Sequence, residues 1–353
     1  MISKFSPRRL GWILIAWIFG FCLLPDSLAT LAVWLCGIWA MALVSTGFMR
    51  WTWVTGLWSF WLLWQWIGLL WSPAPALSLL SCAVSSTLVL IFLLGSSWWF
   101  AAHRRFWLAT FWVMTGFYFA FRVLYWRVPL FPDVVSPAQW RAALDLPWSV
   151  FLHGYGPGAG SHYIPQAASP LLLACVADMG WISAALMLWA LFHSVRKGFK
   201  QAHWAQISAV LPALLLTIGA FAMNVSFSPF MAGLWFSAIA LSCAALGAEE
   251  EIEEAEEWSA PGWIWALGLV GMTMACSLNM WARARPLESY LEWVPIDVSA
   301  RKTLVEECLK RDPPAFAKAW RHLEAIARQN PWDESIRLRQ DDILARVKGE
   351  TRR

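Results

Sequence analysis

Residues 136–192 read SPAQWRAALDLPWSVFLHGYGPGAGSHYIPQAASPLLLACVADMGWISAALMLWALF, and the rest of the chain is organised around them. The first part of this stretch is polar, aromatic and rich in glycine, and the second part is a long apolar run. An apolar run of about 20 residues can cross a bilayer as a helix. Similar runs come before and after it, so the polar part is expected to lie where membrane meets water. It is also the part of the chain with the richest mixture of polar groups for chemistry.

The composition is that of a polytopic membrane protein. Of the 353 residues, 59% are hydrophobic and 14% are charged, whereas an ordinary soluble domain carries about 25% charged residues. The apolar runs are continuous rather than alternating, which favours transmembrane helices over barrel strands. We therefore predict an all-α membrane bundle of about nine spans with a small extracytoplasmic helical tail. The predicted spans cover about residues 10–24, 27–44, 52–71, 77–98, 106–121, 170–192, 207–225, 230–247 and 261–280.

The basic residues predict how these spans are oriented. Cytoplasmic segments of membrane proteins carry an excess of Lys and Arg. Four basic clusters fall on one side of a nine-span arrangement, and they lie at 4–9, at Arg50, at 104–105 and at 196–200. This arrangement places the N-terminus in the cytoplasm. It places the long loop, at about 122–168, and the C-terminal tail outside.

An acidic run, EEEIEEAEE, occupies residues 249–257. The same count of spans places this run on the cytoplasmic side. We interpret it as a solvated connector between two helices, and a patch that docks a partner is the alternative.

The chain is predicted to divide into two parts. Residues 1–285 form the transmembrane part, whereas residues 286–353 are charged, helical and soluble. The second part places Phe316, Trp320 and Leu323 on one face of a helix, and it resembles a fragment of a tetratricopeptide array. The tail could pack as a small cap on the loop, or it could recruit a protein partner.

Cysteine and tryptophan usage limits the classes of site to consider. Of the seven cysteines, only Cys308 lies in the tail, so the tail has no internal disulfide. The sequence has neither paired CxxC motifs nor an HExxH motif, so no metal site and no cofactor are expected. The net charge of +4 is small, and no nucleic-acid partner is expected. The 29 tryptophans are typical of interfacial belts and helix packing, although some could stack on sugar rings or lipid headgroups.

Residues 140–160, WRAALDLPWSVFLHGYGPGAG, resemble the segment before the catalytic region of O-antigen ligases and related polysaccharide polymerases. In that family an amphipathic stretch with a tryptophan precedes a proline-rich turn and a loop of the G-x-G-x-G type. Residues 71–81, WSPAPALSLLS, also resemble a turn between early spans of the family. The positions that fit the family pattern are Trp140, Gly154, Gly156, Pro157, Gly158, Leu173, Val176, Asp178 and Gly180.

The resemblance implies a fold and a function. The fold is a GT-C-like bundle in the bacterial cytoplasmic membrane. The function is transfer or polymerisation of glycan from an undecaprenyl-diphosphate carrier, outside the membrane and without a metal, in O-antigen or exopolysaccharide assembly. The implied partners are the lipid-linked glycan and membrane lipids.

The chain departs from the family at functional positions. The family histidine and asparagine are expected at Ser169 and Pro170, and a family arginine is expected at Ser136. These departures leave open whether the chain is an enzyme. The alternative is a catalytically degenerate scaffold in the same assembly pathway. A transporter is disfavoured because charged residues are nearly absent from the predicted spans.

Substitutes for the missing groups lie nearby. A diphosphate needs cationic donors, and Arg122, Arg127 and Arg141 are the candidates for binding it. An acceptor hydroxyl needs a base within hydrogen-bond reach, and His153 and His162 are the candidate catalytic residues. The glycines Gly154, Gly156 and Gly158 permit tight turns and are assigned to substrate binding. The arginines could instead anchor the chain at lipid headgroups, and the histidines could be structural parts of the loop.

Overall fold

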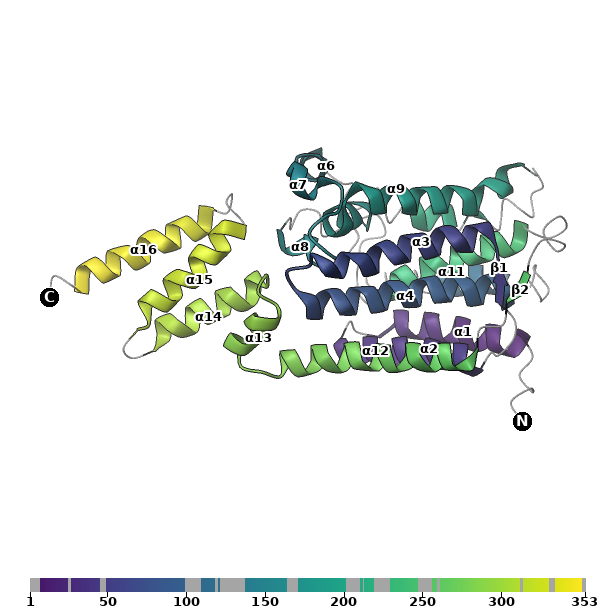
Figure 1. Ribbon diagram of the computed structural model, residues 1–353, viewed down its shortest axis with the longest axis horizontal. Helices are drawn as coiled ribbons and strands as arrows, with labels where there is room; N and C mark the ends of the chain where they lie inside the picture. The colour runs from purple at the N-terminus through teal and green to yellow at the C-terminus, as the bar shows by residue number, and fades with distance from the viewer. Residues whose placement is uncertain are drawn as a thin grey trace.

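The computed structural model describes most of the chain. Described are residues 7–24, 27–44, 49–98, 109–117, 120, 137–163, 171–200, 210–211, 213–218, 229–246, 256–258, 261–311, 314–329 and 334–350. These residues form an apolar helical bundle and a charged helical tail, with one short two-stranded ribbon (Figure 1).

Helix α4 (Pro75–Trp98) lies at the centre of the bundle, where it packs against α2, α3, α11 and α12 (Figure 1). The other helices of the bundle are α1 (Pro7–Cys22), α2 (Leu28–Val44), α3 (Trp53–Ile67), the 3-10 helix η1 (Gly68–Leu70), α9 (Leu171–Lys200), α11 (Pro229–Leu246) and α12 (Gly262–Arg283). Helix α9 packs against α3 and α11. Each of the helices α3, α4, α11 and α9 thus packs against the next, and α9 packs back against α3.

Local sequence signals mark where several of these helices begin. Thr52 and Thr55 form a capping box at the start of α3, in which each side chain accepts a hydrogen bond from the backbone amide of the other. Helices α4 and α11 each begin with a proline, Pro75 and Pro229. A proline is favourable in the first turn because its missing N–H would have no partner there.

Three of the described helices are long and apolar enough to cross a membrane. They are Pro75–Ser97, Leu172–Arg196 and Gly262–Arg283, with mean hydropathies of 2.4, 1.7 and 1.4. The prediction of a helical chain with membrane-spanning helices is confirmed at this level. The count of nine spans and the GT-C-like arrangement stay predictions, and parts of the fifth and seventh predicted spans lie outside the described residues.

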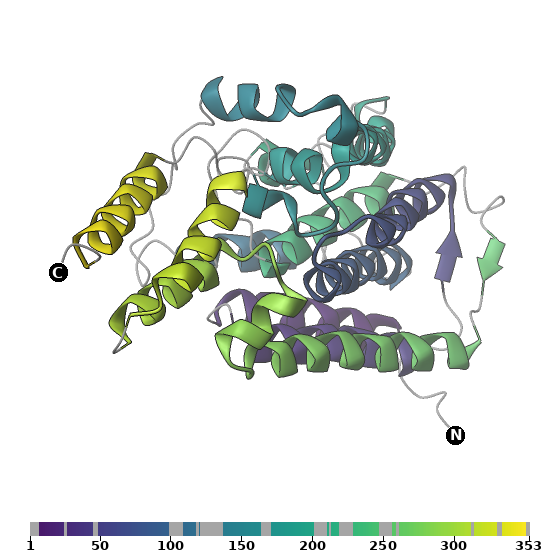
Figure 2. The same cartoon turned by 60° about the vertical axis from the view of Figure 1, so that its left-hand side comes forward.

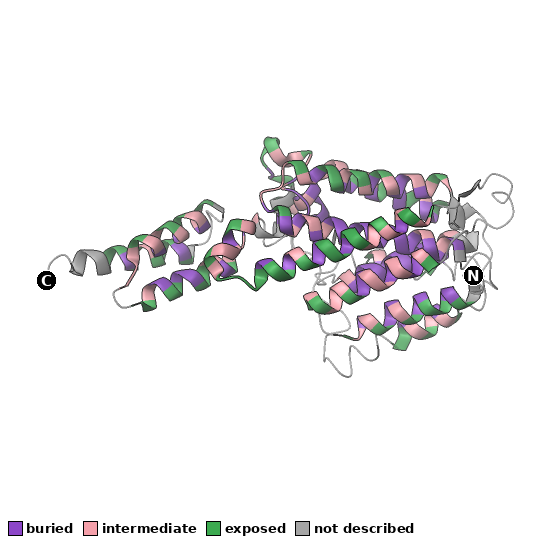
Figure 3. Cartoon of the chain, turned by 60° about the horizontal axis from the view of Figure 1, so that its bottom comes forward, coloured by how far each residue is buried: buried purple, intermediate pink, exposed green. Residues whose placement is uncertain are grey.

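Aromatic side chains are the largest of the fully buried side chains in the core of the bundle. Trp34, Trp58 and Trp235 are fully buried. The Trp58 ring lies 4.8 Å from the Phe236 ring and 6.5 Å, edge to face, from the Trp235 ring, an arrangement that the ring quadrupoles favour. Figure 3 shows buried residues gathered where the helices face one another, with exposed residues on their outer faces.

The two ends of the bundle differ in what they carry. Helix α1 begins at the same end as a ribbon in which β1 (Met49–Trp51) pairs antiparallel with β2 (Glu256–Trp258), where the acidic run ends (Figure 1). The opposite end carries the short helices α6 (Pro137–Leu144), α7 (Trp148–Phe151) and α8 (Gly160–Tyr163), together with the tail (Figures 1 and 2). The loop and the tail were predicted to share one side of the membrane, and they share one end of the bundle. Which end faces the cytoplasm stays a prediction.

The tail has a hydrophobic core of its own. It consists of α13 (Leu287–Trp293), α14 (Val298–Lys310), α15 (Phe316–Gln329) and α16 (Glu334–Glu350). Helix α14 packs on α15, and α15 packs on α16. Leu304, Leu323 and Ile326 are buried between them, and Phe316 and Trp320 pack against this cluster as the helical spacing predicts.

His322 on α15 should make the stability of the tail depend on pH. Its Nδ1 lies 3.4 Å from Nη1 of Arg301. Burial lowers the pKa of His322 below its ordinary value of 6.5, and the charges of Arg301 and Lys318 act in the same direction, against an opposing effect of Glu288. The folded tail therefore binds this proton less readily than the unfolded tail. The free energy of unfolding of the tail is highest above the ordinary pKa of 6.5 and decreases as the pH falls below it.

We expect amide-exchange protection in α14 and α15 of the full chain to decrease between about pH 7.5 and pH 5.5. The variant His322→Gln should lose this dependence. The pKa of the Glu288 carboxyl is lowered from 4.5 by its hydrogen bond to Lys318, so Glu288 does not titrate in this window. Equal decreases in the parent and in His322→Gln would contradict the assignment.

Candidate functional site

A glycine-rich loop, residues 152–160, docks onto α9 where that helix bends. Gly180 interrupts α9 with a φ of 72° and a ψ of −177°. Only glycine adopts this conformation readily. A Cβ atom at Gly180 would also overlap the backbone carbonyl of Leu152, so the bend and the loop are in direct contact.

The loop supplies the backbone hydrogen bonds that the bend removes from α9. In an uninterrupted helix the Ile182 amide would donate to the Asp178 carbonyl. Here the Ile182 amide donates to the Leu152 carbonyl (3.4 Å), while the Asp178 carbonyl accepts from the Gly156 amide (2.7 Å). The Ala177 carbonyl accepts from the loop as well, from the Tyr155 amide at 3.0 Å. Loop and helix therefore complete one another's hydrogen bonding.

The Asp178 side chain holds the end of the loop. Its Oδ1 accepts from the Gly160 amide at 2.7 Å, and its carboxylate also accepts from the Gly158 amide. Amide donors satisfy a buried carboxylate without a cation. Within the described ranges, no lysine or arginine forms a salt bridge with Asp178.

The three glycines assigned from the sequence have the backbone conformations that tight turns need. Gly154, Gly156 and Gly158 have φ values of 70°, 106° and 72°. Added Cβ atoms at Gly156 and Gly158 would lie 2.8 Å from Cβ of Ser72 and 3.2 Å from Cβ of Ser81. The amides of Gly154, Gly156 and Gly158 all donate to protein acceptors. The substrate-binding role of these glycines stays a prediction, and a bound substrate would have to be held largely by side chains.

The turn between α3 and α4 holds the other side of the loop. The Ser78 hydroxyl donates to the Pro157 carbonyl at 2.6 Å and lies 2.5 Å from the Ser72 hydroxyl. Gly68 lies against Pro157, with no room for a side chain. The stretch at 71–81, which resembles a family turn, thus contacts the glycine loop directly.

The start of the tail covers the loop. Val294 and Ile296 are buried against Ala74 and Ala159. Tyr155 and Tyr163 belong to the same cluster, and their rings stack with centroids 4.2 Å apart. This contact favours the interpretation of the tail as a cap on the loop, and recruitment of a protein partner stays a prediction.

Among the predicted catalytic residues, His153 is well defined. It is half-buried, its ring lies 5.1 Å from the Trp71 ring, and its Nδ1 is 2.8 Å from the Gly154 carbonyl oxygen. A carbonyl oxygen only accepts hydrogen bonds, so Nδ1 must carry a proton. In the neutral ring, Nε2 is then free to accept a proton. The other candidate, His162, lies in α8, and its side chain is outside the described atoms.

Of the three predicted arginines, the structure describes Arg141. Arg141 lies in the last turn of α6 and is exposed. Arg122 and Arg127 lie outside the described residues, as do Ser169 and Pro170. The structure thus gathers His153 and the three glycines in one loop, and it leaves the grouping of the arginines as a prediction.

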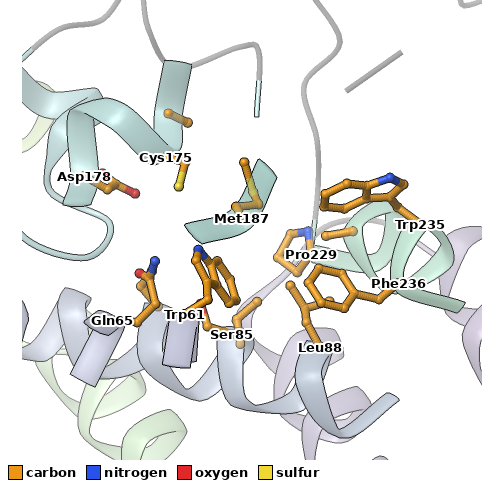
Figure 4. Close-up of a pocket in the computed structure, with 14 residues that line it drawn as sticks. Trp61, Gln65, Ser85, Leu88, Cys175, Asp178, Met187, Pro229, Trp235 and Phe236 are labelled. Carbon is orange, nitrogen blue, oxygen red and sulfur yellow. The ribbon is translucent and has the colours of Figure 1, made fainter. Parts of the chain in front are cut away.

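A cavity of about 160 Å³ lies inside the bundle between α3, α4, α9 and α11. Figure 4 shows the Asp178 carboxylate, the Cys175 thiol and the Gln65 amide around one part of it, with aromatic and aliphatic side chains around the rest. The Gln65 amide donates to the Ser183 hydroxyl at 2.9 Å. No group of three or more His, Cys, Asp or Glu side chains in the described ranges could hold a metal ion.

Asp178 belongs to the site, although the sequence predicted it only as a position that fits the family pattern and not as a site residue. The available signal was its position as the one acidic residue in the apolar run at 170–192, since an ionisable residue within a span is expected to be functional. Trp61 and Gln65, which also line the cavity, gave no comparable signal.

Comparison of the chain with protein-family models, with curated proteins and with solved structures finds no match. The class that the fold defines is a helical protein with membrane-spanning helices.

Proposed function

We propose that this chain is a membrane glycosyltransferase-like protein of cell-envelope polysaccharide assembly. It transfers or polymerises glycan from an undecaprenyl-diphosphate carrier. The observation that carries the proposal is the glycine loop mounted on the bend of α9, next to Asp178 and Gly180, at one end of an apolar bundle. The loop resembles the segment that precedes the catalytic region of O-antigen ligases, so we place the candidate catalytic groups in and beside it.

The rigid mounting of the loop suits a transfer reaction. Backbone hydrogen bonds of Leu152, Tyr155 and Gly156 with α9 fix the backbone on both sides of His153, and such preorganisation lowers the cost of bringing reactants together. The protonated Nδ1 faces the Gly154 carbonyl, which leaves Nε2 as a base for an acceptor hydroxyl. A base in a fixed position can take the proton from an acceptor hydroxyl and so activate it as a nucleophile.

In the proposed reaction, His153 Nε2 takes the proton of the acceptor hydroxyl. The hydroxyl oxygen forms a bond to the anomeric carbon of the glycan, and the bond from that carbon to the diphosphate oxygen breaks. The electron pair leaves with the undecaprenyl diphosphate. Arginine side chains would stabilise the added negative charge, with Arg141 as the described candidate and Arg122 and Arg127 as the others.

The test is a binding and turnover assay with the purified chain in liposomes and an undecaprenyl-diphosphate-linked sugar. We expect binding, glycan transfer and release of undecaprenyl diphosphate. The variant Arg141→Ala should bind the carrier about tenfold to a hundredfold more weakly, because a charge-assisted hydrogen bond is lost. Arg321→Ala, an exposed change on α15, is the matched control and should bind normally.

The outcomes separate the two candidate functions. Binding without turnover would favour the scaffold, which the serine and proline at the family's histidine and asparagine positions already suggest. Neither binding nor turnover would overturn both. Equal binding by Arg141→Ala and Arg321→Ala would remove Arg141 from the carrier site.

A further inference from the structure

The cavity between α3, α4, α9 and α11 contains a polar group without an oxygen or nitrogen acceptor. Trp61 on α3 is buried, with 6% of its surface exposed. Its indole Nε1 has no oxygen or nitrogen acceptor within hydrogen-bond geometry, and Figure 4 shows this nitrogen pointing toward Cys175. The indole N–H faces the Cys175 sulfur and interacts with it, but sulfur is a weak acceptor. The Cys175 thiol also contacts the Ser183 hydroxyl at 3.1 Å.

A buried indole N–H that faces only a weak sulfur acceptor is poorly satisfied. A buried donor without an acceptor costs about 1–3 kcal/mol, and buried tryptophan N–H groups usually find a partner. The neighbouring polar groups are already paired with one another, since Gln65 and Cys175 both contact the Ser183 hydroxyl. A ligand that presents an acceptor to Trp61 would remove this cost.

The Asp178 carboxylate lines the same cavity as an acceptor. A carboxylate has about four lone-pair sites, and the amides of Gly158 and Gly160 use two of them. A donor in the cavity can therefore still bind to it. A hydroxyl group satisfies both sides, because it accepts from the indole N–H and donates to the carboxylate.

The remaining walls require an apolar ligand body. Leu88, Met187 and Phe236 line the cavity away from these polar groups (Figure 4). The cavity volume is about 160 Å³, which corresponds to about five water molecules at their volume in the liquid. A buried water needs two to four polar partners, and the apolar walls do not offer enough partners to hold five.

We propose that this cavity is a binding site for a hydroxyl-bearing apolar molecule, such as a medium-chain alcohol or the hydroxyl of a lipid. Its hydroxyl lies between the Trp61 indole and the Asp178 carboxylate, and its carbon body packs against Leu88, Met187 and Phe236. The site shares Asp178 with the mounting of the glycine loop, but binding of its ligand does not require the proposed glycan transfer.

The test uses photolabelling of the full chain in a bilayer. The probe is a medium-chain primary alcohol that carries a diazirine, and its partner is the same diazirine on an alkane without the hydroxyl. We expect the alcohol to label the cavity segments of α3 and α9 in a way that excess unlabelled alcohol abolishes. Its apparent affinity should fall about twofold to tenfold in Trp61→Phe, which removes one hydrogen bond and keeps an aromatic ring.

Two further variants complete the experiment. Asp178→Asn keeps an oxygen acceptor for the Gly160 amide but replaces the other oxygen with a donor, so it should weaken labelling as well. Trp263→Phe changes an exposed tryptophan on α12 and should leave labelling unchanged. If either cavity variant fails to fold, the other still carries the test.

Several results would overturn the proposal. One is cavity labelling by the alkane as strong as labelling by the alcohol. Another is equal labelling of the parent, Trp61→Phe and Asp178→Asn. Labelling that unlabelled alcohol does not reduce would mean partition from the bilayer only. None of these measurements needs a glycan substrate, so failure here is separable from failure of the proposed transfer.

A lipid hydroxyl and a free alcohol are distinguished by a second arm. Saturable protection of the cavity by lipid extracts that contain hydroxylated lipids, but not by phosphatidylcholine vesicles, would identify the lipid source. Protection only by the added alcohol would identify a small free alcohol as the ligand class.

Discussion

Replacing His153 with alanine is expected to lower the rate of glycan transfer by about 10²–10⁴-fold, which is the usual contribution of a positioned general base. Binding of the lipid-linked sugar should change little, because Nε2 acts on the acceptor hydroxyl and not on the carrier. The measurement is single-turnover transfer by the reconstituted chain, compared with carrier binding in the same vesicles.

The variant His153→Asn separates a base from a structural part of the loop. An asparagine amide nitrogen can donate to the Gly154 carbonyl as Nδ1 of His153 does, but asparagine cannot accept the proton. We expect His153→Asn to be as slow as His153→Ala. Recovery of the rate in the asparagine variant would show that the ring only supports the loop. His193, which lies farther along α9, gives the matched control, and His193→Ala should transfer at the parent rate.

Replacing Gly180 with alanine should strongly destabilise the protein. The backbone at Gly180 lies in a region that other residues avoid, with φ 72° and ψ −177°, and an added Cβ would overlap the Leu152 carbonyl. Strain of this kind and overpacking against backbone together should lower the free energy of unfolding by about 2–6 kcal/mol. Thermal unfolding of the purified chain in detergent, followed by circular dichroism, measures the loss.

Gly271→Ala in α12 is the control for this change. Gly271 is helical and exposed, and nothing lies within 4 Å of a Cβ atom built there. Alanine in an open helical position should raise the stability by about 0.5–1 kcal/mol. A Gly180→Ala protein that unfolds at the parent temperature would mean that the loop does not hold the bend of α9 as described.

Apolar runs in the sequence predicted where several helices lie. The predicted spans at about 77–98 and 230–247 correspond to α4 (Pro75–Trp98) and α11 (Pro229–Leu246). The span predicted at about 170–192 continues as helix through the basic residues to Lys200. Hydropathy marks the end of the apolar run, whereas charged residues such as Arg196 remain compatible with helix, so the helix extends beyond the predicted span.

The loop was only partly predictable for a physical reason. The clustered glycines indicated tight turns, and Gly154, Gly156 and Gly158 have the positive φ values that such turns require. The transfer of hydrogen bonds between the loop and α9 depends on two segments meeting in space. The spacing of residues within either segment alone does not predict these hydrogen bonds. For the same reason the sequence offered Asp178 as a lone acid but not the amides of Gly158 and Gly160 as its partners.

The shared hydrogen bonds between the loop and α9 have a consequence for how the protein is made. Ribosomes synthesise the loop before α9. The amides of Tyr155 and Gly156 therefore have no acceptors until the carbonyls of Ala177 and Asp178 have been synthesised. Val294 and Ile296, the tail residues that cover the loop, are synthesised later still. The region therefore matures in two stages, first when α9 enters the membrane and again when translation reaches the tail. Until the second stage, the face of Tyr155 and Tyr163 that the tail later covers stays open to chaperones and proteases at the membrane surface.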